Sequence, residues 1–447
     1  MPIAGKSGFR LARRMAAQDL LRQYYEMMME SQYWAPEQLL AFQRQQLAQL
    51  LRHARAQSPF YEHRLDAVLR ADGGIDWDRW SEIPILKRSD LLEHRDQMLA
   101  CQLPPGHGPV QEVSTSGSTG APARIATTVI SSVAGRASVW RMQRWHEMDW
   151  SRHMVSWMGE DERSARPEGH SAGRWGPPWM PHATGELFYV SRTWPPAQVL
   201  EFVERIGAAY LTGRPKSMQY LALDALQHDA RLPLHGMLCF GTGISADERE
   251  DCSAAFGAEM WSHYSSKEMG PIAHQCSGGR HLHVNAESVL VEIVDEAGRA
   301  VPPGEAGLVV ATSIYSTAQP LIRYEQGDLA VADAGGCGRT LPVLEAVTGR
   351  VTNLFRFPDG ARVAPSVPDH YRSLLGAKYW QIAQVGPLEL EVRYVPFDGP
   401  AADEAAFAEV VRQHIHRKDV SIRFAARETL ERAAGGKFVQ YVCELPN

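Results

Sequence analysis

The stretch VSTSGSTGAPARI, residues 113–125, places hydroxyl side chains around two glycines and contains no acidic residue. Gly117 and Gly120 allow backbone conformations that direct successive N–H groups toward one point. The hydroxyl donors beside them are Thr115, Ser116, Ser118 and Thr119. A loop of this composition suits a polyphosphate, although a Ser/Gly-rich surface turn has the same composition. It is not the G-x-x-x-x-G-K-[ST] loop, because no Lys-Ser or Lys-Thr ends it and no helix clearly follows.

Length and charge limit the class of protein. The chain has 447 residues, too many for one compact core, which predicts a large domain and a smaller one. Its 46 basic and 52 acidic residues include no basic run interleaved with aromatic residues, so we expect no nucleic-acid partner. No apolar stretch follows the basic N-terminus, as one would in a signal peptide. No apolar stretch of the sequence is long enough to span a bilayer. The six cysteines are scattered like reduced thiols, and these features predict a cytoplasmic protein without a membrane partner.

The hydrophobic pattern predicts an α/β protein. Residues 15–70 repeat apolar side chains at helical spacing, and residues 80–350 alternate short apolar runs with helical patterns, as in a sheet flanked by helices. A turn-rich crossing and then a short α+β pattern follow. We therefore predict domains at residues 1–348 and 349–447. The Gly- and Pro-rich residues 160–182 predict a long mobile loop.

Five further motifs follow the opening stretch in a fixed order. They are CFGTGIS (239–245), HYSSKEMG (263–270), PLIRYEQGDLA (320–330), TGRVTNLF (348–355) and GGKFVQYV (435–442). With these motifs the chain resembles the adenylate-forming (acyl-CoA synthetase-like) superfamily over nearly its whole length. Within that superfamily it is similar to the phenylacetate–CoA ligase and capsule-biosynthesis-type branch. The resemblance implies a large N-terminal α/β domain with mixed sheets flanked by helices, and a small mobile α+β C-terminal lid domain.

The resemblance assigns ATP contacts to the residues that match the family's motifs. The loop residues that would hold the β- and γ-phosphates are Thr115, Ser116, Gly117, Ser118, Thr119 and Gly120. The other nucleotide contacts that it implies are Gly241, Thr242, Gly243, His263, Tyr264, Ser265, Asp328 and Arg350. Tyr264 matches an adenine-stacking aromatic residue, and Asp328 would accept both ribose hydroxyls. The family's loop ends in Pro-Lys, whereas this chain carries its cation one residue later, at Arg124.

The resemblance also implies the catalytic residues. Glu268 matches a magnesium-binding carboxylate, the kind of oxygen ligand that a cation bridging phosphates requires. Lys437 matches the lysine that closes over the active site and stabilises charge at the α-phosphate. Lys267 stands where the family has Ser or Thr. It either contacts the α-phosphate, pairs with Glu268 and hinders magnesium, or points into solvent.

A structural zinc site is a separate expectation. Relatives in this branch carry one built from Cys and His, and the matching residues here are Cys276, His281 and Cys337, with His283 nearby. The first cysteine of the family's C-x-C pair is replaced by Gly335. A closed tetrahedral site needs four ligands, and the fourth would be His274 or Cys252. The alternative is a set of ordinary thiols without metal.

The resemblance implies a two-step ligase that uses ATP and magnesium. ATP and a carboxylic acid give an acyl-adenylate and pyrophosphate, and an acceptor then displaces AMP. Seven of the twelve tryptophans lie between Trp140 and Trp194, which favours an aromatic or bulky apolar acid, although these rings suit a core equally.

The acceptor and the activity itself remain open. The phenylacetate-type resemblance implies the thiol of CoA. The stretch FRFPDGARVAPS, residues 355–366, resembles capsule-type and indoleacetate–lysine ligase-type members and implies an amine. A catalytically silent nucleotide-binding relative is the alternative from another class. The expected partners are a small-molecule acid and its acceptor, and a homodimer is left open.

Overall fold

The fold comes from a computed structural model. It describes residues 17–115, 122–159, 169–180, 184–191, 193–333, 337–350, 354–363, 365, 367, 369–396, 402–430 and 439–445.

Helices form where apolar side chains recur at three and four residues. They are α2 (Ala17–Ser31), α3 (Pro36–Gln57), α4 (Arg88–Glu93), α5 (Arg95–Met98), α6 (Val129–Trp145), α7 (Pro196–Ile206), α8 (Pro215–Gln227), α9 (Ala246–Phe256) and α10 (Glu404–His414). Short 3-10 turns span Pro59–Tyr61, Trp77–Glu82 and Asp369–Leu375.

The strands fall into one large sheet and three small ones. Those of the large sheet are β3 (His153–Gly159), β4 (His170–Arg174), β5 (Glu186–Ser191), β6 (Ala208–Gly213), β7 (Gly236–Phe240), β8 (Met260–Ser266), β9 (Gly270–Gln275), β10 (Leu282–Val284), β11 (Val289–Val294), β12 (Ala306–Ser313), β13 (Tyr324–Asp333) and β14 (Val343–Arg350). The others are β1 (Gln111–Ser114), β2 (Arg124–Thr127), β15 (Phe355–Arg356), β16 (Arg362–Val363), β17 (Ala377–Gly386), β18 (Glu389–Pro396), β19 (Ser421–Ala426) and β20 (Tyr441–Cys443).

The large sheet has twelve strands in the order β11-β12-β13-β14-β10-β9-β8-β7-β6-β3-β5-β4. The run from β8 through β7, β6 and β3 to β5 is parallel, and the remaining neighbours pair antiparallel. The direction changes between β8 and β9, so the sheet is mixed, as the sequence predicts.

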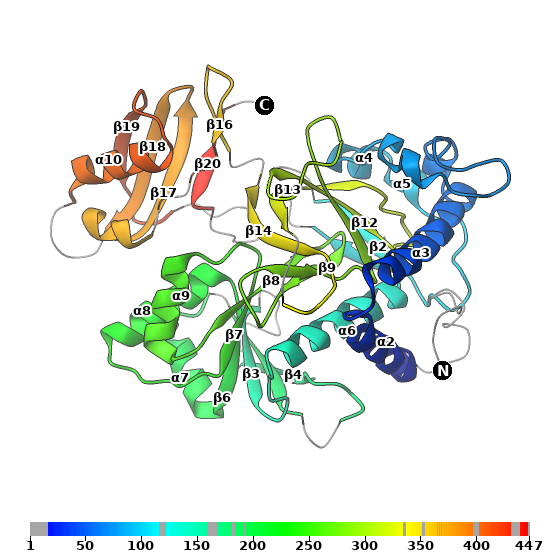
Figure 1. Cartoon of the computed structure of the whole chain (residues 1–447). Coiled ribbons are helices and arrows are strands. Elements are labelled where there is room, and N and C mark those ends of the chain that lie inside the picture. Colours follow the sequence, from blue (N-terminus) through cyan, green and yellow to red (C-terminus); the bar gives the residue numbers. More distant parts are fainter. Residues whose placement is uncertain are drawn as a thin grey trace.

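Helices cover both faces of the parallel half (Figure 1). One apolar cluster joins α7, α8 and α9 to one face, and a second joins α2 and α6 to the other. Strand β6 illustrates this arrangement of helices on both faces. Its whole run AAYLTG is buried, and Leu211 packs into the first cluster while Tyr210 packs into the second. Continuous burial of this kind is typical of a parallel strand between two helical layers.

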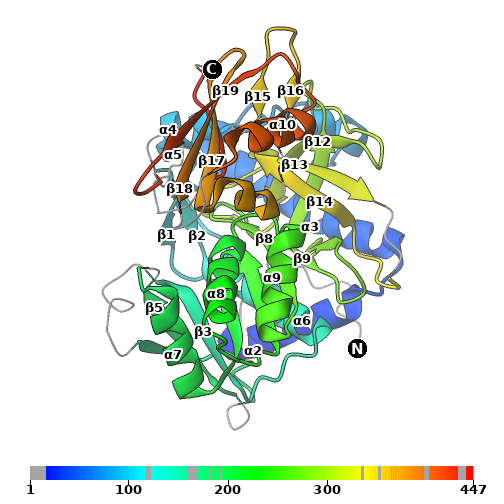
Figure 2. The ribbon, with the colours of Figure 1, turned by 90° about the vertical axis from the view of Figure 1, so that its left-hand side faces the viewer.

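The C-terminal part has a core of its own. Strands β19, β18, β17 and β20 form a four-stranded sheet, on which α10 packs through Phe407 and Val411. Figure 2 shows this unit above α8 and α9. It meets them through the Tyr220 and Tyr379 rings, 4.4 Å apart between centroids, and through a 3.7 Å ion pair between Arg372 and Asp251. The predicted boundary at residue 348 lies two residues before the end of β14. The domain division stays a prediction.

Two local expectations were wrong. The predicted loop at residues 160–182 contains strand β4, which pairs with β5 at the edge of the sheet. Gly169 and Gly173 both adopt positive φ, so the glycines that favour a loop here serve an irregular edge strand. In the region at residues 15–70, which was predicted to be helical, the last α-helix ends at Gln57, because Ser58 and Pro59 break the pattern.

A buried ion pair ties the N-terminal helices to the sheet. Arg141 on α6 and Glu287, between β10 and β11, are both completely buried, and their closest N–O distance is 2.5 Å. Arg141 also donates to Asn285 Oδ1 at 2.9 Å and to the carbonyl of Met28 at 3.1 Å. Ser31 Oγ donates to the same carboxylate. Two charges removed from water in this way are stable only while each keeps its partners.

We predict that Arg141→Ala lowers the free energy of unfolding by about 3–5 kcal/mol, because Glu287 is left as an unpaired buried charge. Urea denaturation followed by circular dichroism measures this loss. The double variant Arg141→Met/Glu287→Leu is the control, and it should lose less than the single variant because no charge remains buried. A loss below about 1 kcal/mol, the usual value of an exposed pair, would contradict this role.

Candidate functional site

A cavity of about 1000 Å³ opens beside the turn between β8 and β9. Its wall includes Lys267 and Glu268 from that turn, residues of α6 and β3, and the ends of β6 and β7. These strand ends are carboxyl ends of parallel strands, the edge at which open α/β sheets bind ligands. Lys267 and the predicted magnesium ligand Glu268 therefore share a wall with Trp140 and Trp175 of the tryptophan-rich region.

Tyr264 and Asp328 lie next to each other, although 64 residues separate them. The Tyr264 hydroxyl on β8 donates to Asp328 Oδ2 on β13 at 2.9 Å. In the backbone register, Asp328 stands opposite Arg350 of β14. The structure thus brings together three positions that the sequence assigns to the nucleotide.

Glu268 is held by two partners from distant segments. Tyr324 on β13 donates its hydroxyl to Glu268 Oε1 at 3.2 Å, and Arg88 of α4 has its Nη1 3.6 Å from the same oxygen. Burial raises the pKa of Tyr324, so its hydroxyl stays a donor. Arg88 Nη2 also donates to Thr115 Oγ1 at 3.2 Å. One guanidinium therefore connects the predicted magnesium carboxylate to the start of the predicted phosphate loop.

Sequence reasoning missed Arg88 and Tyr324. Arg88 lies within the stretch PILKRSDLL, before the phosphate loop, and Tyr324 lies four residues before Asp328. Only the tertiary contacts show that both meet Glu268. The nearest signal for Tyr324 in the sequence was its place in the motif YEQGD, where no role was assigned to it.

Lys267 is exposed toward the cavity. Within the part of the chain that the structure describes, it makes no hydrogen bond or ion pair, and Glu268 pairs with Arg88 instead. The alternative in which Lys267 neutralises Glu268 therefore has no support. A contact with a bound phosphate remains the prediction.

Thr115 begins a hairpin turn and not a strand–helix loop. Strands β1 and β2 pair antiparallel, with Ser114 opposite Arg124, and Thr115 and Ala123 exchange hydrogen bonds at the base of the turn. Arg124 is exposed, and its guanidinium lies 3.8 Å from Glu112. The predicted loop residues 116–120 lie outside the described residues, as does Lys437, so their roles stay predictions.

Gly241, Thr242 and Gly243 form an exposed turn between β7 and α9. Gly241 has φ +91°, which disfavours any residue with a side chain. Helix α9 begins immediately afterwards with a capping box, in which Ser245 Oγ accepts from the Glu248 amide at 3.2 Å. This capping fixes where the turn ends.

His263 and Ser265 lie on β8 on either side of Tyr264. The Nδ1 atoms of His263 and His274 are 3.0 Å apart, and burial lowers the pKa of His263 to about 4, so the ring is neutral. The His263 side chain is thus used inside the protein, and its predicted nucleotide contact stays untested. Ser265 opposes Pro271 across the β8–β9 pair.

The tryptophan-rich segment belongs largely to the core, and two of its buried rings also line the cavity. Trp140 and Trp175 are part of the cavity wall. Trp150, Trp157 and Trp194 are buried in the two core clusters. The prediction of an aromatic pocket is therefore supported by two tryptophan rings in the cavity wall and not by all seven.

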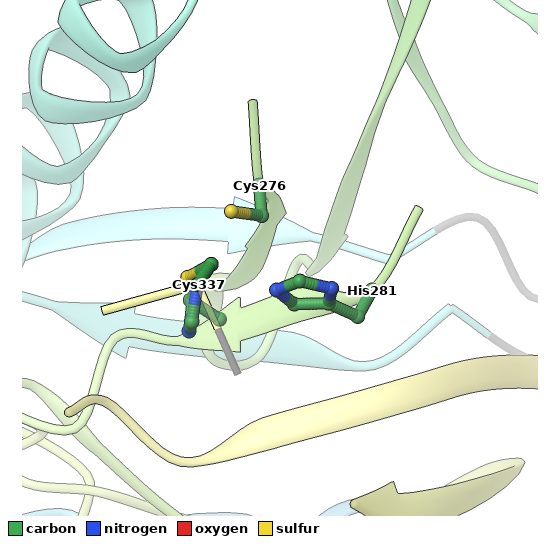
Figure 3. A group of neighbouring side chains, drawn as sticks. Cys276, His281 and Cys337 are labelled. Carbon is green, nitrogen blue, oxygen red and sulfur yellow. The ribbon is translucent and has the colours of Figure 1, made fainter. Parts of the chain in front are cut away.

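Four metal-ligating side chains converge between β9, β10 and β14. The ligand atoms of Cys276, His281, His283 and Cys337 all lie within 4.8 Å of one another. Figure 3 shows Cys276, His281 and Cys337 coming together from three segments of the chain. His281 Nε2 is buried with no hydrogen-bond partner in the structure, and Cys276 is buried. Two thiols and two imidazoles are a donor set that zinc accepts, so the residues fit such an ion.

The expected fourth ligand was wrong. His274 bonds instead with His263 and Ser138, and Cys252 is a buried residue of α9 in the first core cluster. His283 takes the fourth position, with its Nε2 3.0 Å from Cys337 Sγ. His281 and His283 are two residues apart in an extended segment, so both rings reach the same face.

Comparison with known proteins places the chain in a family. Residues 40–317, more than half of the chain, match the AMP-binding enzyme family. The chain belongs to this family. That result confirms the resemblance inferred from the motifs.

Individual relatives are more distant. The phenylacetate–coenzyme A ligase of Thermus thermophilus is 29% identical over 135 residues, which cover 25% of this chain and 30% of that protein. The chain thus matches less than a third of the length of this curated relative.

Solved structures match over a larger part of the chain. 2-Hydroxyisobutyryl-CoA ligase in the postadenylation state, in complex with R3-HIB-AMP, has a TM-score of 0.69 at 18% identity and covers 99% of this chain and 94% of its own. The anthranilate CoA ligase in complex with anthranoyl-AMP has a TM-score of 0.55 at 16% identity, with coverages of 76% and 67%. At such identities the likeness concerns the fold, and it confirms the predicted α/β class. No described helix is both long and apolar enough to cross a bilayer.

We predict that Asp328→Asn weakens binding of AMP roughly ten- to a hundredfold, the usual loss when a hydrogen bond to a charged group is removed. Isothermal titration calorimetry measures the affinity. Asp333→Asn, at the exposed end of the same strand, is the control and should bind AMP as the parent does. Unchanged affinity in Asp328→Asn would remove the carboxylate from the ribose site.

Proposed function

We propose that the chain is an ATP-dependent, AMP-forming acid–CoA ligase. The observation that carries this proposal is the pairing of Tyr264 with Asp328 and of Arg88 with Glu268, a residue of the cavity wall, in a member of the AMP-binding enzyme family. The first pair supplies a ribose acceptor and an aromatic ring. The second supplies a carboxylate for a cation and a guanidinium next to the phosphate hairpin.

The nucleotide lies along the carboxyl ends of β7 and β8. Adenine rests between the Gly241–Gly243 turn and Tyr264, and Asp328 accepts the ribose hydroxyls. The β- and γ-phosphates lie toward Thr115 and Arg88. Magnesium, when bound at Glu268, neutralises phosphate charge.

In the first step, an oxygen of the acid's carboxylate attacks the α-phosphorus, and the bond between that phosphorus and the bridging oxygen breaks to release pyrophosphate. Lys267 and Lys437 stabilise the charge that develops on the α-phosphate oxygens. In the second step, the CoA thiolate attacks the acyl carbon and AMP leaves with the bond electrons. The product is a thioester.

The cavity supports an aromatic or bulky apolar acid, because Trp140 and Trp175 supply flat apolar surface to its wall. 2-Hydroxyisobutyryl-CoA ligase, a relative in fold, has been solved in complex with 2-HIB-AMP and CoA, which supports CoA as the acceptor here. We place the enzyme in the cytoplasm, where ATP and CoA are available and thiols remain reduced.

We predict that the first step releases pyrophosphate and the second step AMP, and that Lys437→Ala slows pyrophosphate release about a hundredfold or more while ATP still binds. A coupled pyrophosphate assay over aromatic and aliphatic acids, with and without CoA, measures the rate. Lys418→Ala, on the same C-terminal unit, is the control and should react normally. Formation of ADP would contradict the assignment to this reaction.

Two further outcomes separate the alternatives. Faster AMP formation with an amine and not with CoA, together with an amide product, would replace the thioester reaction. ATP binding without turnover of any acid would favour a silent relative. In the same assay, Lys267→Ser restores the hydroxyl usual in the family, and an unchanged rate would remove Lys267 from the chemistry.

We also propose a structural zinc ion held by Cys276, His281, His283 and Cys337. Zinc–sulfur and zinc–nitrogen bonds of about 2.3 and 2.0 Å require ligand atoms closer together than 4.8 Å, so the cluster contracts slightly on binding. Arg339 Nη1 donates to Cys276 Sγ at 3.2 Å and offsets the charge of the two thiolates. The ion would join β9 and β10 to the segment before β14.

We predict about one zinc ion per chain by atomic emission, and its loss in Cys276→Ser and in His283→Ala. Cys101→Ser is the control, because Cys101 is exposed and distant from the cluster in sequence. Cobalt substitution should give the absorption of a tetrahedral site with two thiolates. Protein that contains no zinc and whose Cys276 and Cys337 react freely with a thiol reagent would contradict the site.

A further inference from the structure

The cavity has an unusual charge for a pocket that accepts a simple apolar acid. Among the described residues, its wall carries Arg136, Arg174 and Lys267, against a single carboxylate at Glu268. Glu268 already has Arg88 as a partner. The wall is therefore electropositive, in a chain whose formal net charge is -6.

Arg136 faces the cavity because of its position on α6. Ser132, Arg136, Val139 and Gln143 recur at three- and four-residue spacing and all line the cavity, so they form one stripe along the helix. Arg136 sits in this stripe one turn from Trp140. The next residue toward the N-terminus, Gly135, lies against Pro271 of β9, where an added Cβ would come within 3.0 Å of the proline ring.

Arg174 approaches the cavity from a different element. It ends β4, the edge strand, and stands next to Trp175 in the wall. Its neighbour across the β4–β5 ladder is Glu186, which is not part of the wall and forms no ion pair with it.

Both Arg136 and Arg174 are exposed. Across the described ranges of the chain, neither Arg136 nor Arg174 makes a hydrogen bond or an ion pair. Other arginines of this protein behave differently. Arg141 and Arg323, for example, each have several oxygen partners. Cations on a partly apolar wall are most stable when an anion binds between them.

We propose that the acid substrate is a dicarboxylic acid, whose second carboxylate is bound by Arg136 and Arg174. The inference rests on the proposed function, since it takes the first carboxylate to react at Lys267. Trp140 and Trp175 hold the apolar scaffold between the two carboxylates. A guanidinium fork matches a carboxylate with two parallel hydrogen bonds, which a lysine does not provide.

The phosphates of ATP or CoA are a second source of negative charge for the same arginines. Binding of the acid alone separates the sources, because neither nucleotide is present. Tryptophan fluorescence reports such binding directly, since Trp140 and Trp175 line the cavity. This readout needs no catalysis, so a failure of the ligase proposal does not affect it.

The probes are matched pairs of acids: benzoate with terephthalate, and phenylacetate with 4-carboxyphenylacetate. We expect at least one diacid to bind the parent protein about tenfold or more tightly than its monoacid partner. Arg136→Gln and Arg174→Gln should each weaken the diacid roughly ten- to a hundredfold, the loss typical of a charge-assisted hydrogen bond, and leave the monoacid nearly unchanged. Arg136→Lys should recover part of the loss.

Arg144→Gln on the same helix is the matched control, because Arg144 lies over Trp150 and is not part of the cavity wall. It should bind both acids as the parent does. Equal affinity for diacids and monoacids in the parent overturns the proposal. So do arginine variants that weaken ATP or CoA binding but leave diacid binding intact. If the diacid binds as expected but supports no pyrophosphate release, the proposed ligase function fails and the dicarboxylate site stands.

Discussion

The reversal of strand direction between β8 and β9 is the constraint on which the site depends. Strand β8 runs parallel to β7 but antiparallel to β9, so the turn that carries Lys267 and Glu268 projects from the same edge as the Gly241–Gly243 turn. Burial of the parallel half between two helical layers fixes these strand ends in space. The antiparallel half then brings Tyr324 and Asp328 up to the edge from the other side.

The order of the nucleotide motifs and the hydrophobic pattern are visible in the sequence, and together they predict the fold. The contacts that join distant segments are not visible there. Arg88 and Tyr324 reach Glu268 only through the packing of α4 and β13. Strand β4 could not be predicted from the sequence, because glycine occurs both in loops and in irregular edge strands. His283 was within reach of sequence reasoning, since an H-x-H spacing in a strand places both rings on one face.

The C-terminal unit contacts α8 and α9 through an aromatic pair and a 3.7 Å ion pair, and Arg362 pairs with Glu296. The pair between Arg362 and Glu296 is exposed, so it contributes little free energy and is screened by salt. The ion pair between Arg372 and Asp251 is largely shielded from solvent. The whole chain resembles the postadenylation state of 2-hydroxyisobutyryl-CoA ligase more closely than its thioesterification state, with TM-scores of 0.69 and 0.58.

Strand β20 determines how proteolysis would affect the C-terminal unit. Strand β20 is only three residues long, yet it closes the C-terminal sheet beside β17, and Gln381 holds the carbonyl of Val439 at 2.8 Å. Lys437 precedes that anchored segment by two positions. A carboxypeptidase that trims the chain past Tyr441 would remove the strand and the ring that packs on Trp380. Trimming of this kind would leave the large sheet intact but open the C-terminal sheet beside β17. A preparation with ragged ends would then mix molecules with and without this strand at almost the same mass.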